Sequence, residues 1–121
     1  MIKGIKFATI PVSDQDRALD FYTKQLGFTV ATDQPFNDKQ RWIELRIPNA
    51  ETRVVLFTMD GHEDRIGTFQ GLSFVSNDVK KTYDELKARG VEFAGPPKTA
   101  DWGSSAIFKD PDGNQFVLSS K

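Results

Sequence analysis

Polar and apolar positions follow the same order of periods in the two halves of this chain. In the first half, about residues 5–12 predict a strand. A helical period follows, and it places Ala18, Phe21, Tyr22 and Leu26 on one face. Strands are then predicted over 28–30, 41–47 and 53–58. The first half therefore reads as one βαβββ unit.

Both ends of the first predicted helix have a chemical signal. Asp14 offers a carboxylate that can accept a hydrogen bond from the first turn. Gly27 suits the left-handed position just past a helix end, where a Cβ atom costs energy. The sequence therefore predicts a helix between these two residues.

The second half repeats this order. A strand over 72–75 leads into a helix capped by Asn77 or Asp78 and ended by Gly90. Its apolar positions are Val79, Tyr83 and Leu86. Strands over 91–93, 105–108 and 115–118 follow, with an extended passage at Pro96–Pro97 and a turn over 110–114.

The two halves are in register. Val12 to Val75 spans as many positions as Gly27 to Gly90, so the helix and both of its ends recur together. We expect an α+β fold in one domain, residues 1–121. Module one covers about 1–60, a connection about 59–70 and module two about 71–121. Paired modules usually enclose a cleft, where a ligand would bind.

Composition narrows the class of protein. The net charge is −1 with mixed signs, which argues against nucleic acid as a partner. The chain has no cysteine, so thiolate metal sites and cysteine nucleophiles are excluded. No apolar run predicts a membrane span and the first residues do not resemble a signal peptide. We expect a cytoplasmic protein that does not bind membranes.

The motifs at the helix ends and in the last turn carry a family resemblance. They are Val12-Ser13-Asp14, Arg17-Ala18-Leu19, Phe21-Tyr22, Leu26-Gly27-Phe28, Leu86, Gly90-Val91 and Asp110-Pro111-Asp112-Gly113-Asn114. The chain resembles the vicinal oxygen chelate superfamily, which includes glyoxalase I, bleomycin-resistance proteins, fosfomycin-resistance enzymes and extradiol dioxygenases. The resemblance implies paired βαβββ modules whose curled sheets enclose a cleft, and a homodimer.

Enzymes of this superfamily hold a divalent metal with His, Gln or Glu side chains. The matching positions here are Phe7, Gly71 and Val117, with Leu56 at a position that glyoxalase I uses. None of these side chains can donate a lone pair to a metal. We therefore expect no metal and no cofactor at the family site.

The remaining candidates are polar and aromatic residues of the strands and loops. Alternation puts Trp42 and Glu44 on one strand face, where Glu44 is either a general base or ligand acceptor, or an ion-pair partner of Arg41, Arg46 or Arg53. Trp102 either stacks on a planar ligand or caps the core. His62, the only histidine, is either a solvated loop residue, a metal ligand or a base. The predicted cleft residues are Phe7, Trp42, Glu44, Leu56, Gly71, Ser73, Trp102 and Val117.

Three functions stay open at this stage. The leading interpretation is a metal-independent small-molecule-binding protein that acts by sequestration, as bleomycin-resistance proteins do. The second is a glyoxalase-like lyase, isomerase or dioxygenase whose displaced metal site uses Glu44, His62 and Gln115. The third is a structural role, with the cleft filled by the protein's own Phe7, Trp42 and Trp102.

Overall fold

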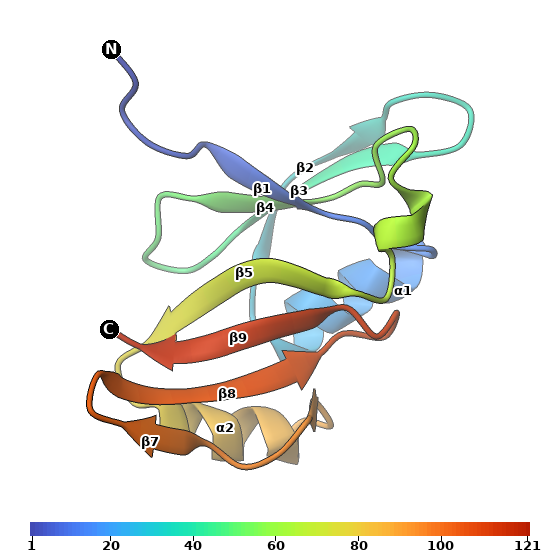
Figure 1. Ribbon diagram of the computed structural model, residues 1–121. Helices are drawn as coiled ribbons and strands as arrows, with labels where there is room; N and C mark the ends of the chain where they lie inside the picture. The colour runs from blue at the N-terminus through green and yellow to red at the C-terminus, as the bar shows by residue number, and fades with distance from the viewer. The chain divides into compact units, whose positions relative to one another are not determined.

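A computed structural model describes all residues of the chain, 1–121. The chain divides into two compact units, Met1–Ile66 and Gly67–Lys121. Each unit combines one mixed β-sheet with helical segments, so the α+β class and the paired βαβββ-like arrangement are confirmed (Figure 1). No helix is both long enough and apolar enough to cross a membrane.

Unit 1 contains four strands and three short helical segments. The sheet order is β1-β4-β3-β2, in which β1 runs parallel to β4 and the other neighbours are antiparallel. The elements are β1 (Phe7–Ile10), α1 (Gln15–Asp20), η1 (Phe21–Gln25), β2 (Thr29–Pro35), β3 (Arg41–Arg46), β4 (Arg53–Leu56) and η2 (Glu63–Arg65).

The first helix begins and ends where the sequence predicts, but its last part is π-helical. The Asp14 carboxylate accepts a hydrogen bond from the Arg17 backbone N–H at 3.0 Å, and Gly27 has a φ of 82°. In η1, the Thr23 hydroxyl donates to the Leu19 carbonyl at 2.6 Å. That carbonyl is the acceptor an α-helical Thr23 N–H would use, so this contact favours the wider turn.

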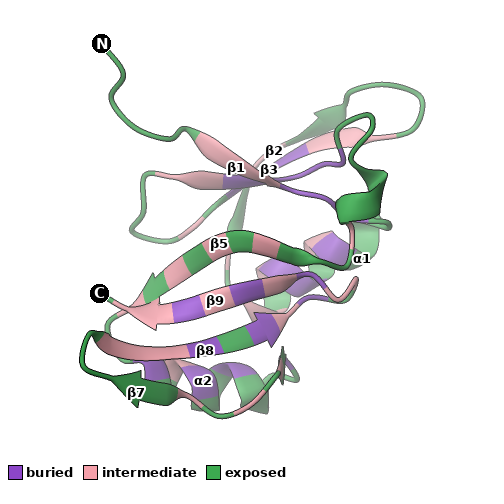
Figure 2. Ribbon diagram, viewed as in Figure 1, coloured by how far each residue is buried: buried purple, intermediate pink, exposed green.

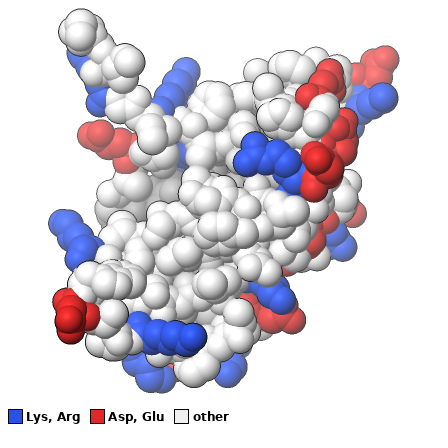
Figure 3. Space-filling model, viewed as in Figure 1, with Lys and Arg blue, Asp and Glu red and all other residues white.

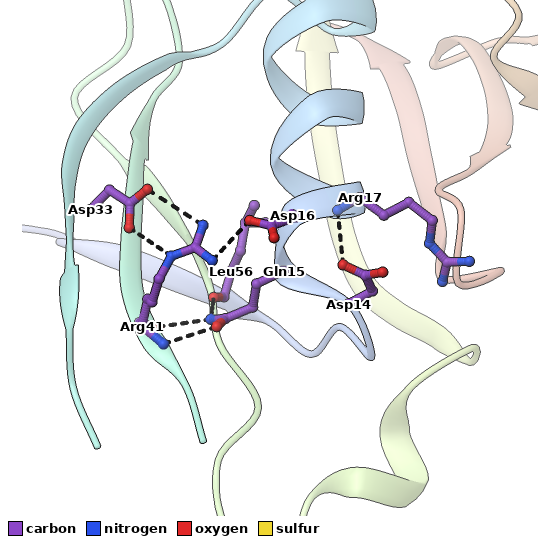
Figure 4. A network of polar contacts seen from close by, with 7 residues as sticks. All are labelled: Asp14, Gln15, Asp16, Arg17, Asp33, Arg41 and Leu56. Atoms are coloured by element: carbon purple, nitrogen blue, oxygen red, sulfur yellow. Dashed lines mark hydrogen bonds and ion pairs between the residues drawn. The ribbon is translucent and has the colours of Figure 1, made fainter. Parts of the chain in front are cut away.

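A polar network joins α1 to strands β3 and β4 (Figure 4). The Gln15 amide donates to the carbonyls of Arg41 and Leu56, and the Gln15 carbonyl accepts from the Arg41 backbone N–H. The Arg41 side chain forms ion pairs with Asp16 and Asp33 at 2.9 and 3.0 Å. The Gln15 side chain thus satisfies backbone groups at the first residue of β3 and the last residue of β4.

The centre of one face of the unit 1 sheet is buried. The ladder pairs Ile43 with Leu56 and Leu45 with Val54, and all four side chains are at most 2% exposed. The helical segment contributes Ala18, Phe21 and Tyr22 to the same buried set, and α1 contacts β4. This face therefore forms the core of unit 1.

Unit 2 contains five strands and one helix. The sheet order is β5-β9-β8-β6, with β7 paired to β8 on a separate stretch. The elements are β5 (Phe69–Ser76), α2 (Val79–Ala88), β6 (Glu92–Phe93), β7 (Lys98–Ala100), β8 (Gly103–Lys109) and β9 (Gln115–Ser120).

Helix α2 covers one face of this sheet, as Figure 1 shows. Of the two predicted caps, Asp78 is the one whose side chain accepts from the first turn, at the Lys81 N–H. The predicted apolar positions Val79, Tyr83 and Leu86 are buried. Under the helix, the sheet presents Ala106, Phe108, Phe116 and Leu118, all buried.

The last turn has a buried carboxylate at its centre. Asp110 is 6% exposed, and one of its oxygens accepts from the N–H groups of Asp112 and Asn114. The Asn114 side chain donates to the other oxygen at 2.8 Å, and Gly113 has a φ of 83°. These contacts explain why Asp, Gly and Asn occur at these spacings.

Candidate functional site

The face of the unit 1 sheet opposite its core gathers several of the predicted cleft residues. Strand alternation puts Trp42 and Glu44 on this face, and the ladder pairs Glu44 with Val55. Phe7 of β1 is paired with Arg53 of β4, whose side chain reaches Glu44. Phe7, Trp42 and Glu44 are therefore neighbours in the structure.

Aromatic rings cover much of this face. The Trp42 ring lies 5.4 Å from Phe7, 5.9 Å from Phe36 and 5.3 Å from Phe57, measured between centroids, and Phe36 and Phe57 are 4.9 Å apart. Phe57 is 5% exposed, whereas Phe36 is 59% exposed and Trp42 is half-buried. We call these four residues the aromatic cluster. It is anchored at Phe57 and open to solvent at Phe36.

Glu44 sits beside this cluster as a buried, paired carboxylate. It is 8% exposed and accepts hydrogen bonds from Arg53 at 2.7 Å and from the Trp42 indole N–H at 3.2 Å. Hydrogen bonding to Arg53 lowers the pKa of Glu44, outweighing the opposite effect of burial. An ionised carboxylate with a lowered pKa is a weak general base. Of the three arginines considered as partners, Arg53 is the one that pairs.

Leu56 does not lie on this face, which corrects the expectation that it lines the same surface as Glu44. It pairs with Ile43 and is fully buried in the core of unit 1. Successive side chains of a strand point to opposite faces, so an error of one residue in the alignment places a side chain on the wrong face. Val55 and Phe57 stand on the aromatic side instead, and neither can ligate a metal.

In unit 2, the sheet face away from α2 is open. The ladders place Ser73 beside Val117, and Val117 beside Ile107. The Ser73 and Ser119 hydroxyls are 2.7 Å apart, and Val75 is 66% exposed. Exposed and half-buried residues run along β5 in Figure 2, and the surface there has few charged atoms in Figure 3. Gly71 is an exposed residue of the same strand, with a φ of 70°.

Trp102 lies in the turn between β7 and β8. Its side chain is 66% exposed, so the interpretation that it caps the core is wrong. The turn holds the indole at the surface because β7 is a short, exposed strand that offers no apolar surface for packing. Trp102 stays available to contact a ligand.

The residues present do not form a family-type metal site. Phe7, Gly71 and Val117 offer no donor atoms, and no group of three or more His, Asp or Glu side chains is placed to hold a metal ion. His62 is exposed and precedes η2, where its backbone contacts Met59 and Arg65. Glu44, the first residue of the alternative displaced site, has both oxygens engaged.

Two members of the aromatic cluster were not predicted. Phe57 follows the apolar run of β4, and alternation from Arg53 would have placed it beside Trp42. Phe36 stands between Pro35 and Asn37 just after β2, where no periodicity signals its position. The contact of Phe36 with Trp42 and Phe57 depends on the conformation of the loop before β3. In this loop the N–H groups of Phe36 and Asn37 both donate to the Gln40 carbonyl.

Comparison with known proteins identifies the family. The model of the glyoxalase/bleomycin resistance protein/dioxygenase superfamily matches residues 4–118, so the chain belongs to this superfamily. The uncharacterised protein YetH of Bacillus subtilis (strain 168) is 38% identical, with 98% of each chain covered.

Two solved structures are similar over nearly the whole chain. A superfamily member from Sphaerobacter thermophilus DSM 20745 has 37% identity and a TM-score of 0.88, covering 99% of this chain and 98% of that one. TnmS3, described as an antibiotic binding protein from Streptomyces sp. CB03234, has 36% identity and a TM-score of 0.86, covering 98% and 96%.

Proposed function

We propose that this protein binds a planar organic small molecule on the aromatic cluster of unit 1, and that it does so without a metal ion. The observation that carries the proposal is the cluster itself, four rings in contact with one edge open to solvent at Phe36. Similarity to an antibiotic binding protein supports the same class of function.

Aromatic surfaces of this kind favour flat, conjugated ligands. Offset-stacked and edge-to-face pairs add about 0.5–1.5 kcal/mol each beyond the burial of apolar area. Trp42 contacts three other rings, and its indole N–H is fixed by Glu44, so the ring is held in place before a ligand arrives. A preorganised surface loses less entropy on binding.

Sequestration is the role that this chemistry supports. Glu44 is ionised and paired with Arg53, and the family ligand positions hold no metal donors. An apolar lining with few polar groups suits the binding of an organic ligand. Gly71, Ser73 and Val117 on the open sheet face of unit 2, and the exposed Trp102, are a separate proposal for ligand contacts within that unit.

Tryptophan fluorescence tests the proposal directly. Trp42 and Trp102 are the only tryptophans, so the Trp102→Phe variant leaves Trp42 as the single reporter. We would titrate this variant with a panel of polycyclic aromatic compounds, including antibiotics, and measure affinities by calorimetry. We expect saturable quenching by at least one compound.

Variants of the cluster then locate the binding. Phe36→Ala and Trp42→Leu should weaken binding about tenfold or more, as expected for the loss of one ring contact and its apolar area. Phe28→Leu is the matched control, since Phe28 is half-buried and stacks on Tyr22 at the helix. An entire panel without saturable binding, or equal affinity in all variants, would contradict the proposal.

A further inference from the structure

Two arginine side chains oppose each other beside the aromatic cluster. Arg46 of β3 and Arg53 of β4 are partners in the antiparallel ladder, so both side chains leave the same face of the sheet. Like charges directly opposite each other destabilise a strand pair. Lys6 adds a third positive charge, close enough to act on Glu44. Glu44 is the one carboxylate that the structure pairs with this group, so positive charge is in excess.

Most of the hydrogen-bond donors of these arginines are not used within the protein. Arg53 donates one hydrogen bond, to Glu44, and Arg46 donates one, to the Val30 carbonyl at 3.2 Å. Each guanidinium has five N–H donors in a planar fork. Arg46 is exposed, and the Arg53 side chain is 36% exposed, so solvent or a ligand can reach the remaining donors.

The arginines and the rings are connected through shared partners. Phe7 is paired with Arg53 across β1 and β4, and its ring meets Trp42 edge to face. The Trp42 indole N–H and Arg53 donate to the two oxygens of the same carboxylate, Glu44. Glu44 therefore positions both the cationic group and the ring next to it.

We propose that the natural ligand class is a planar aromatic carboxylic acid, with its ring on Phe7 and Trp42 and its carboxylate on Arg53 and Arg46. A carboxylate matches a guanidinium fork with two parallel hydrogen bonds. It would also relieve the repulsion between the opposed arginines. This inference rests on the proposed small-molecule binding and specifies the ligand for that site.

The test compares two ligands of the same shape and different charge, 2-naphthoate and 2-naphthamide. Calorimetry at neutral pH should give at least about tenfold tighter binding for 2-naphthoate, the effect of one additional charge-assisted hydrogen bond. The preference should decrease at high salt. Arg46→Gln should remove most of this preference, with a much larger loss of affinity for 2-naphthoate than for 2-naphthamide, because the charge-assisted bond is the stronger one. Lys24→Gln is the control, because it deletes one positive charge from the exposed helical segment η1.

Arg53 needs a balanced variant, since removing it alone would leave a buried carboxylate unpaired. The double variant Glu44→Gln/Arg53→Gln removes both charges, and we expect it to abolish the preference for the acid. Equal affinity of the two probes, or a preference that survives in both arginine variants, would overturn the inference. If neither probe binds while polycyclic compounds do, the inference fails and the proposed function stands. If the compound panel also fails, both are wrong.

Discussion

At the scale of single residues, the Glu44–Arg53 ion pair has a predictable effect on stability. The pKa of Glu44 is lowered from its ordinary value of 4.5 because Arg53 stabilises the charged form. The ion pair therefore stabilises the fold at pH values above 4.5, and this contribution is lost as the pH falls through the lowered pKa.

We expect Glu44→Gln to lower the free energy of unfolding by about 1–2 kcal/mol at pH 7, a modest value because Arg53 is partly exposed to water. Urea unfolding from pH 7 down to pH 3 should show the difference from the unmodified protein shrinking below pH 4.5. Asp84→Asn, which removes an exposed helical ion pair with Lys80, should show a much smaller difference. A difference for Glu44→Gln that does not change with pH would show that the charge contributes nothing.

Gly103 is a residue where an added side chain would be strained. Its φ is 139°, and a Cβ atom there would collide with the Ser120 Oγ, which accepts a hydrogen bond from the Ser104 N–H. We expect Gly103→Ala to lower the free energy of unfolding by about 1–3 kcal/mol.

A double-mutant cycle separates the collision from the backbone strain at Gly103. In a Ser120→Ala background the colliding oxygen is absent, so Gly103→Ala should cost less than it does with Ser120 present. Urea unfolding of the four proteins measures the difference. If the two costs are equal, backbone strain alone explains the effect and the collision is relieved by rotation of the serine.

At the scale of elements, Gln15 fastens α1 to the sheet of unit 1. Its amide group makes three hydrogen bonds to backbone groups of Arg41 and Leu56. Gln15→Ala leaves these buried or half-buried groups without partners, so we expect a loss of about 2–3 kcal/mol in the free energy of unfolding. Thermal or urea unfolding followed by circular dichroism would measure it.

The neighbouring Asp16 provides the matched control for Gln15. Its side chain is 83% exposed and pairs with Arg41 at 2.9 Å. Exposed ion pairs contribute about 0–1 kcal/mol, so Asp16→Asn should have little effect. If Asp16→Asn lowers the free energy of unfolding as much as Gln15→Ala does, the ion pair rather than the backbone hydrogen bonds holds α1 against the sheet.

The elements also show what the sequence could predict. Both helix starts, both glycine ends and the final turn were predictable, because each depends on local chemistry that a few adjacent residues determine. Strand β7 was missed because Lys98–Ala100 is short, polar and exposed, and its pairing with β8 is a tertiary contact. Strand β5 begins at Phe69, before the predicted start at 72, within the glycine-bearing connection.

The candidate site was only partly predictable for a related reason. Alternation within β3 correctly grouped Trp42 with Glu44, since both lie on one strand. Whether the side chains of Leu56 and Phe7 point to the same face of the sheet depends on the register between β1 and β4. No local sequence pattern determines this register. The choice of Arg53 over Arg41 is likewise a result of strand pairing. The sequence therefore predicted which residues of one strand share a face, but it did not predict which residues pair across strands.

At the scale of the whole molecule, the residues of this chain predict that no metal ion binds at the positions where enzymes of the superfamily hold one. Enzymes of the superfamily hold a divalent ion, but this chain has Phe7, Gly71 and Val117 at the matching positions, and no cluster of three potential ligands elsewhere. A metal that binds the folded state at one hundred times its Kd would stabilise the protein by about 2.7 kcal/mol. We therefore expect Zn²⁺, Ni²⁺, Mn²⁺ and Fe²⁺ to leave the Tm unchanged in a thermal-shift assay.

Mass spectrometry of purified protein should find far less than one metal ion per chain before and after EDTA treatment. A Tm raised by one ion alone, together with stoichiometric metal that EDTA removes, would show that ligands come from other residues and would make an enzymatic role the better hypothesis.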